Sequence, residues 1–264
     1  MNWNGRASII STGNGSFSAR IDHHWLALKG LHGGIVAALV VEATDAVLAD
    51  HGVDGDFVLR AATFGYLSTN DIGESIIEID IVRRGRSMIA THARVVQNGA
   101  ITTVARLHHS RPRSGLEFSD APPPMSKPNN AVRLDRPTPN HFRNVEAHLH
   151  PDTTMFGDAE RAEWIAWARP LDTDSFDSSW LTMYGDFYPP AVFAKLDAPT
   201  PAVTIEYSIQ IHDHARQWTL ASDEHLATRM HTFHSHDGLA VEDGSVHQPD
   251  GTLLATFRQT RLSG

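Results

Sequence analysis

The sequence predicts an α+β fold in which two antiparallel sheets are each wrapped around a long central helix. The same order of short strands, one helix and further strands occurs twice along the 264 residues. Both halves also end in a similar strand, Gly-containing turn and strand, VVQNGAITTVAR at 95–106 and SVHQPDGTLLATFR at 245–258. The first helix is apolar on nearly every side, which is typical of a helix enclosed by a curved sheet.

The first half, residues 1–110, is expected to form an N-terminal domain with one helix. That helix covers residues 31–50, where LHGGIVAALVVEATDAVLAD opens with His-Gly-Gly and continues with few polar residues. Alternating apolar and polar residues predict the strands of this half at 7–10, 16–22, 57–67, 75–82, 87–97 and 100–110.

A linker at residues 111–140 is expected to separate this half from a C-terminal domain at 141–264. The linker is dense in proline and polar residues and has no sustained period. In the second half, a helix is predicted within residues 174–193, and Pro189 and Pro190 are expected to end it. Its strands are expected at 142–150, 162–169, 202–212, 217–234, 239–248 and 252–262. We interpret the two halves as an internal duplication, with two unrelated α+β domains as the alternative.

Composition argues against several classes of function. A net charge of −9 disfavours general binding to nucleic acid or anionic membranes, both of which need a positive surface. No apolar run approaches the roughly 20 residues of a membrane helix, and the N-terminus lacks the pattern of a secretory signal. The chain has no cysteine and so no disulfide, which suits the cytoplasm. We therefore expect a soluble cytoplasmic protein without nucleic-acid or membrane partners.

Four segments, taken in order, resemble the acyl-CoA thioesterase family, the type II thioesterases with a double hotdog fold. They are HGGIVAAL, VRRGRS followed by VVQNG, GDFYPPAVF, and the C-terminal DGLAVEDGSVHQPDGTLLATFRQTRL. The resemblance implies hydrolysis of an acyl-CoA to a free acid and CoA, without a cofactor. A homo-oligomer is also expected, because each sheet has edges that a second copy can cover.

The helix entry at His32, Gly33 and Gly34 is the first candidate substrate-binding segment. Glycines lack Cβ, so a ligand can approach the backbone, and the N–H groups of a first helical turn point outward. In the family that the chain resembles, a Gly amide at this place holds the thioester oxygen while the positive end of the helix stabilises the oxyanion. Plain capping of a buried helix is the alternative interpretation.

The resemblance implies a hydrolytic centre on three C-terminal strands. It maps an acid to Glu206, a hydroxyl to Thr228 and a water-positioning amide to Gln259, with Glu206 standing where relatives commonly have Asp. Alternation along 202–212 puts Glu206 on a polar strand face, where it could equally be a solvated carboxylate, and Gln259 could be an exposed edge residue. Asp186 is interpreted as a capping or packing residue.

The implied mechanism is direct attack by water without an acyl-enzyme. Neither a cysteine nor a Gly-x-Ser-x-Gly elbow is present to supply a nucleophile of those classes. Binding of acyl-CoA or a related lipid without turnover is the main alternative. Hydration or dehydration of an acyl-CoA is the least favoured alternative, because the sequence near His32 lacks an Asp-to-His pairing of that type.

Three further groups of polar residues are candidates for ligand binding. Arg83, Arg84 and Arg86 form the densest basic cluster and could bind the phosphates of CoA, or they could simply keep an exposed hairpin soluble. Glu42, among apolar residues, is expected to have a structural partner. The 17 histidines include i, i+2 pairs such as His148 and His150, but no recognised metal spacing, so no metal site is expected.

Overall fold

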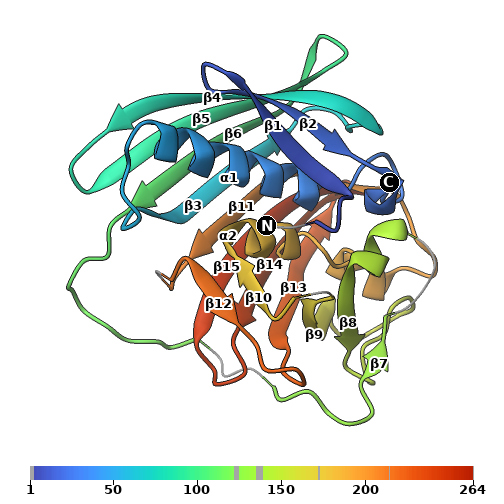
Figure 1. Ribbon diagram of the computed structural model, residues 1–264. Coiled ribbons are helices and arrows are strands. Elements are labelled where there is room, and N and C mark those ends of the chain that lie inside the picture. Colours follow the sequence, from blue (N-terminus) through green and yellow to red (C-terminus); the bar gives the residue numbers. More distant parts are fainter. Residues whose placement is uncertain (1–2, 122–124, 135–138, 172, 214, 264) are drawn as a thin grey trace.

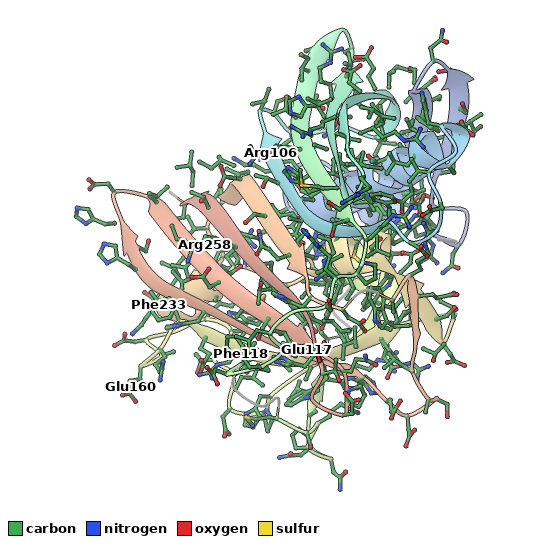
Figure 2. The ribbon with its side chains drawn as sticks, turned by 90° about the vertical axis from the view of Figure 1, so that its left-hand side faces the viewer. Arg106, Glu117, Phe118, Glu160, Phe233 and Arg258 are labelled. Atoms are coloured by element: carbon green, nitrogen blue, oxygen red, sulfur yellow. The ribbon has the colours of Figure 1, made fainter. Side chains whose placement is uncertain are left out.

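The strands form one long antiparallel sheet. The computed structural model describes residues 3–121, 125–134, 139–171, 173–213 and 215–263. Thirteen of the strands in these residues follow the order β1-β2-β4-β5-β6-β3-β11-β15-β14-β13-β9-β8-β7, and β10 pairs with β12 in a separate ribbon (Figure 1). The outer surface of the sheet carries exposed polar side chains such as Arg106 and Arg258 (Figure 2).

The bounds of the elements agree closely with the predicted strands in the first half. That half contains β1 (Ala7–Gly13), β2 (Ser16–Ile21), α1 (Gly33–Asp50), β3 (Val58–Tyr66), β4 (Gly73–Arg84), β5 (Met88–Gln97) and β6 (Ala100–Ser110). The second half contains β7 (Val132–Arg133), β8 (Val145–Leu149), β9 (Glu163–Pro170), β10 (Ser175–Asp177), α2 (Ser178–Tyr184), β11 (Ala202–Ile211), β12 (Gln217–Thr219), β13 (Leu226–His236), β14 (Leu239–His247) and β15 (Leu253–Ser263). Short 3-10 turns lie at His23–Trp25, Asn140–Asn144 and Ala191–Lys195.

The two halves repeat one strand order on either side of a central seam. From the seam outward, β3-β6-β5-β4 in one half matches β11-β15-β14-β13 in the other. The prediction of two separate sheets was wrong, because β3 and β11 pair directly, with residues 61–65 opposite 206–210. Each of these strands would otherwise be the edge of its own half, and the pairing satisfies their edge N–H and C=O groups.

Helix α1 has the enclosed position that its apolar sequence predicted. Twelve of its 18 residues are buried, and it lies within the curve of the N-terminal strands (Figure 1). Glu42 has the structural partners that were expected for it, because its Oε1 accepts hydrogen bonds from Trp3 Nε1 at 2.9 Å and from Ser179 Oγ at 3.4 Å. Burial raises the pKa of Glu42.

The second helix is much shorter than predicted. Asp177 caps α2 by accepting a hydrogen bond from Trp180 N at 3.0 Å, and the helix ends at Gly185 after seven residues. Within the predicted 174–193 segment, residues 175–177 form β10 before the helix, and the part after the helix is a turn followed by a 3-10 turn after Pro189 and Pro190. The predicted strand at 217–234 is likewise divided into β12 and β13.

Both halves contribute to one shared hydrophobic core, in which the two helices pack against each other. The described part of the connecting segment adds the short strand β7 at the far edge of the sheet (Figure 1). Among the described residues, no helix has the length and hydropathy that crossing a membrane requires.

Candidate active site

A cavity of about 610 Å³ opens where the N-terminus of α1 meets the turn after α2 and the start of β11. This volume is ordinary for a small-molecule site. Most of its wall is apolar and includes Leu31, Phe142, Phe156, Phe187, Tyr188 and Phe193. A polar corner interrupts this wall, and its side chains are those of His32, Tyr66, Asp186, Thr204 and Arg261.

Gly33 and Gly34 allow the polar corner to form against the start of α1. A Cβ on Gly34 would lie 2.5 Å from the carbonyl oxygen of Met183, and a Cβ on Gly33 would lie 3.0 Å from Oδ2 of Asp186. The two glycines thus let α1 approach the end of α2 and a carboxylate closely. Tyr66 fixes the first peptide by donating to the Gly33 carbonyl at 3.0 Å. The Gly33 amide is in the first helical turn, where no intrahelical acceptor exists.

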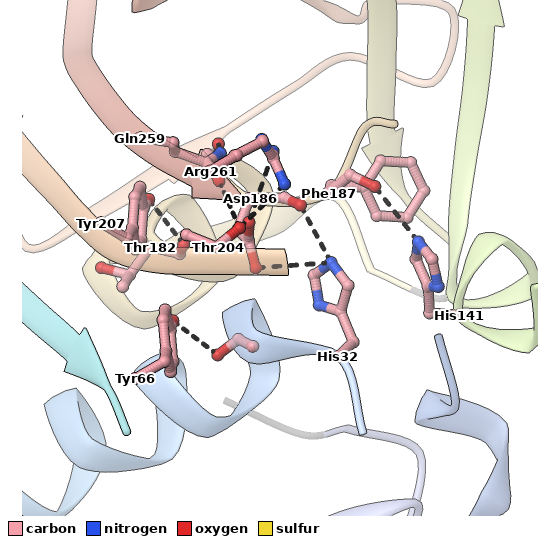
Figure 3. A network of polar contacts seen from close by, with 12 residues as sticks. His32, Tyr66, His141, Thr182, Asp186, Phe187, Thr204, Tyr207, Gln259 and Arg261 are labelled. Carbon is pink, nitrogen blue, oxygen red and sulfur yellow. Dashed lines mark hydrogen bonds and ion pairs between the residues drawn. The ribbon is translucent and has the colours of Figure 1, made fainter. Parts of the chain in front are cut away.

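Asp186 lies buried at the positive end of α1, and only about 6% of its surface is exposed. It accepts a backbone hydrogen bond from Gly34, and Arg261 Nη2 lies 3.8 Å from its Oδ1. Figure 3 shows Arg261 and His32 both directed towards it. Burial raises the pKa of Asp186 to about 6, although Arg261 and the Gly34 amide favour the ionised form. The carboxyl group can therefore exchange a proton near neutral pH.

Gln259 and Thr204 line up beside this carboxyl group. Gln259 Nε2 donates to the Gly185 carbonyl at 3.0 Å, while its Oε1 accepts from Thr204 Oγ1 at 3.0 Å. Arg261 Nη1 donates to Thr204 Oγ1 at 2.8 Å. The amide and the hydroxyl are thereby held in one orientation, as Figure 3 shows.

Arg261 is in turn held by a fully buried carboxylate. Its Nη2 lies 3.1 Å from Oε1 of Glu242, which has no exposed surface. The other oxygen of Glu242 accepts a hydrogen bond from the backbone amide of Ala191. Glu242 therefore ties the cation of the polar corner to the turn that follows Pro190.

Two stacked histidines close the other side of the corner. The rings of His32 and His141 lie 4.4 Å apart and nearly parallel. His32 Nε2 is 3.0 Å from the carbonyl oxygen of Asp186, and since a carbonyl can only accept, this nitrogen carries the proton. Burial lowers the pKa of His32 to about 4, and burial also takes the pKa of His141 well below its ordinary value. Both rings are neutral at physiological pH.

The structure brings some of the sequence-predicted residues together and separates others. His32 and Gly33 line the cavity, the Gly34 amide donates to Asp186 in its wall, and Gln259 is next to it as expected. Thr228 is buried but contacts Tyr184, whose hydroxyl lies 3.0 Å from that of Tyr188 in the cavity wall. Its hydroxyl therefore supports the wall through two tyrosines.

Glu206 lies outside this group of residues. It is exposed and pairs with Thr260 on the outward face of the sheet, away from the buried Gln259. A β-bulge between Thr204 and Glu206 is the physical reason, because one extra residue reverses which face the following side chains occupy. The bulge turns Thr204, rather than Glu206, towards the cavity.

The basic cluster of Arg83, Arg84 and Arg86 is not at the cavity either. Arg84 donates to the carbonyl oxygens of His51 and Gly52, just beyond the last residue of α1. The 18 residues of α1 separate this end from Gly33 by roughly 27 Å, at about 1.5 Å per residue. Arg84 satisfies free carbonyls at a helix C-terminus, which is a favourable place for a cation.

Sequence reasoning missed four residues of the polar corner, namely Tyr66, Asp186, Thr204 and Arg261. Asp186 was interpreted as a cap or a packing residue, and it does accept from a helix N-terminus, although from that of α1 rather than of its own helix. Arg261 carried a usable signal, since it follows Gln259 by two residues and so shares its strand face. No sequence signal identified Thr204, because the orientation of its side chain depends on the β-bulge.

Comparison with known proteins agrees with this architecture. A model of the acyl-CoA thioesterase N-terminal domain matches residues 21–110, and a model of the C-terminal domain matches residues 118–262. None of the curated proteins matches the chain in sequence.

Two solved structures illustrate the shared fold. A conserved protein with a hot dog fold from Alicyclobacillus acidocaldarius is 20% identical, with a TM-score of 0.85 over 99% of this chain and 97% of that one. The acyl-CoA thioesterase II TesB2 from Mycobacterium marinum is 15% identical, with a TM-score of 0.75 over 97% and 96%. At these identities the likeness shows the hotdog fold. Since the two domain models together match most of the sequence, the chain belongs to the acyl-CoA thioesterase family.

Proposed function

We propose that this thioesterase hydrolyses acyl-CoA by direct attack of water, with Asp186 as the general base. The observation that supports this most strongly is a buried carboxyl group with a pKa of about 6 at a helix N-terminus, on the wall of an apolar cavity. A base whose pKa lies near the working pH combines sufficient ionisation with a useful affinity for the proton. This assignment replaces Glu206 as the acid of the centre.

The reaction is balanced by the groups in the polar corner. Asp186 takes a proton from water as the water oxygen bonds to the thioester carbon. The carbonyl oxygen becomes an oxyanion next to the first-turn amide of Gly33 and the positive end of α1. The carbon–sulfur bond then breaks, and the departing CoA thiolate receives the proton held by Asp186. No covalent acyl-enzyme forms in this scheme.

The remaining residues orient the reactants. Gln259 positions the water beside Asp186, since its side chain hydrogen-bonds to that carboxyl group, and Thr204 holds the Gln259 amide in this orientation. The apolar wall receives the acyl chain, because burial of methylene groups there is favourable by about 0.8 kcal/mol each. The neutral His32 adds no positive charge that would lower the affinity of Asp186 for the proton of water.

The test is CoA release from short, medium, long-chain and aromatic acyl-CoAs, measured with a thiol reagent. The chain has no cysteine, so the protein gives no background. We expect turnover with at least one chain length and a fall in kcat of about 10²-fold in Gln259→Ala, the lower range for loss of a catalytic hydrogen-bonding group. Binding of acyl-CoA without any CoA release would identify a non-catalytic binding protein instead.

Recognition of the CoA phosphates is expected at Lys29 rather than at the arginine cluster. Lys29 is exposed on the cavity wall, whereas Arg84 is engaged at the far end of α1. Lys29→Ala should raise KM about 2- to 5-fold, the ratio that corresponds to roughly 0.5–1 kcal/mol for an exposed charge pair. Arg84→Ala is the matched control and should leave KM unchanged. The opposite pattern in steady-state kinetics would return the phosphate role to the cluster.

A further inference from the structure

Three potential metal ligands meet on the outer face of the C-terminal half, away from the cavity. Glu146 and His148 are on β8, and Ala147 between them is buried in the core, so both side chains leave the same face of the strand. His225 reaches the same place from the residue before β13, on the other side of β9. One ligand atom of each residue lies within 4.8 Å of the other two.

The hydrogen bonding of His225 leaves a lone pair directed at a carboxylate. Its Nδ1 is 3.0 Å from the carbonyl oxygen of Asp223, which can only accept, so Nδ1 carries the proton. The Nε2 of the neutral ring is then an acceptor, and it lies 3.1 Å from Oε1 of Glu146. Two acceptors at this distance need a positive charge between them. A proton or a metal cation can supply it.

His148 distinguishes between these two possibilities. Its Nδ1 is buried and has no hydrogen-bond partner among the described residues. Its ring meets that of His225 edge to face, with the centroids 5.2 Å apart. A single proton between His225 and Glu146 would leave the buried Nδ1 of His148 without a partner, whereas a metal ion takes a ligand from all three residues.

We propose that Glu146, His148 and His225 form a binding site for a divalent transition-metal ion, with Zn²⁺ as the best match. Two imidazole nitrogens and a carboxylate oxygen are among the preferred ligands of Zn²⁺, and water can complete the coordination. The Nδ1 hydrogen bond of His225 to a backbone carbonyl is the outer contact that commonly fixes the tautomer of a metal-binding histidine.

Other charged and aromatic groups around the cluster define what the ion would do. Lys127 and Arg133 also face the cluster, because after burial itself they are among the groups that lower the pKa of His148. Their positive charges repel a bound cation and so weaken its binding at this cluster. Trp167 is opposite His148 in the β8–β9 pairing, and its Nε1 donates to Met125 O in the connecting segment. A bound ion would therefore stabilise the outer face of the sheet beside this segment.

The experiment is a calorimetric titration of the chelator-treated full-length protein with ZnCl₂, repeated with Co²⁺ to read its visible absorption. We expect one ion per chain and a higher melting temperature when it is bound. Glu146→Gln and His148→Gln should each weaken binding about 100-fold or more, since loss of even an outer contact costs roughly 10–100-fold. Two variants, each checked by circular dichroism, guard against misfolding of one.

The matched control is the double variant His234→Gln/His236→Gln in the β13–β14 hairpin, where both rings are exposed. It removes two histidines from the surface and should bind Zn²⁺ like the original protein. Loss of binding in this control, or equal binding by the cluster variants, would place the ion on the surface histidines and overturn the proposal. Absence of Zn²⁺ binding to the original protein would show that a proton alone joins His225 and Glu146, and it would overturn the proposal as well.

Discussion

Replacing Asp186 by asparagine should nearly abolish hydrolysis and at the same time make the protein more stable. The amide is almost the same shape but cannot accept the proton of water, so kcat should fall about 10²- to 10⁴-fold, the usual contribution of a general base. Glu206→Gln is the matched control, because that carboxylate is exposed on the opposite face of the sheet. Loss of turnover in Glu206→Gln with activity retained in Asp186→Asn would assign the acid to Glu206.

The gain in stability follows from the raised pKa of Asp186. The native carboxyl has a pKa of about 6 against an ordinary 3.8, so the native state holds this proton more tightly than the unfolded state does. This contribution to stability is present below pH 4 and is lost as the pH rises through 6. Asparagine removes the cost of the buried charge, which should add roughly 1–3 kcal/mol at pH 8.

Two measurements on Asp186 check this reasoning. The free energy of unfolding in urea should differ between the two proteins at pH 8 and much less at pH 4. The kcat of the original enzyme should fall as the pH drops below about 6, because Asp186 then becomes protonated. His32, with a pKa of about 4, does not change its charge in that range, so the fall can be assigned to Asp186. A pH-independent kcat between 5 and 8 would contradict the assignment.

Replacing Glu242 by leucine should cause the largest loss of stability outside the apolar core. The leucine removes the buried carboxylate that neutralises Arg261 and leaves the Ala191 amide without its acceptor. Removing one partner of a buried ion pair typically costs about 3–5 kcal/mol, because the other charge stays buried and uncompensated. Urea unfolding monitored by tryptophan fluorescence would measure the change.

An exposed ion pair on the same two strands provides the matched control. Arg258 and Asp243 join β15 and β14 at a distance of 2.6 Å, in contact with solvent, whereas Arg261 and Glu242 join the same two strands at 3.1 Å in the interior. Asp243→Ala should therefore cost at most about 1 kcal/mol. The double variant Glu242→Leu/Arg261→Met should recover much of the lost stability, since neither charge is then left buried alone. Equal losses in Asp243→Ala and Glu242→Leu would contradict this account.

The sequence predicted those parts of the fold that depend on local patterns. The unbroken apolar run after Gly34 led directly to the enclosed helix α1, and alternation located most strands of the sheet. The length of α2 was not predicted, because the helix ends at Gly185 and Asp186, just beyond it, contacts the N-terminus of α1 in the other half of the chain. The pairing of β3 with β11 could not be predicted from local patterns either, because pairing between strands so distant in sequence leaves no periodic signal.

The site was predicted where it depends on a motif and missed where it depends on register. His32, Gly33, Gly34 and Gln259 were identified from the family pattern, and all four lie in or beside the polar corner. A single bulged residue decided the rest, since simple alternation along 202–212 puts Glu206 and Thr204 on one face. The sequence also offered no indication of the cluster at Glu146, because this residue meets His148 and His225 only when β8, β9 and β13 are assembled.

The seam between β3 and β11 has a consequence for how the chain folds as it is made. All of β3 leaves the ribosome well over a hundred residues before the β11 segment that pairs with it. During that interval, the nascent N-terminal half presents an uncovered strand edge and the face of α1 that α2 later covers. Such exposed edges favour association between copies, so the speed of translation from residue 67 to residue 211 sets how long each new molecule is vulnerable to aggregation.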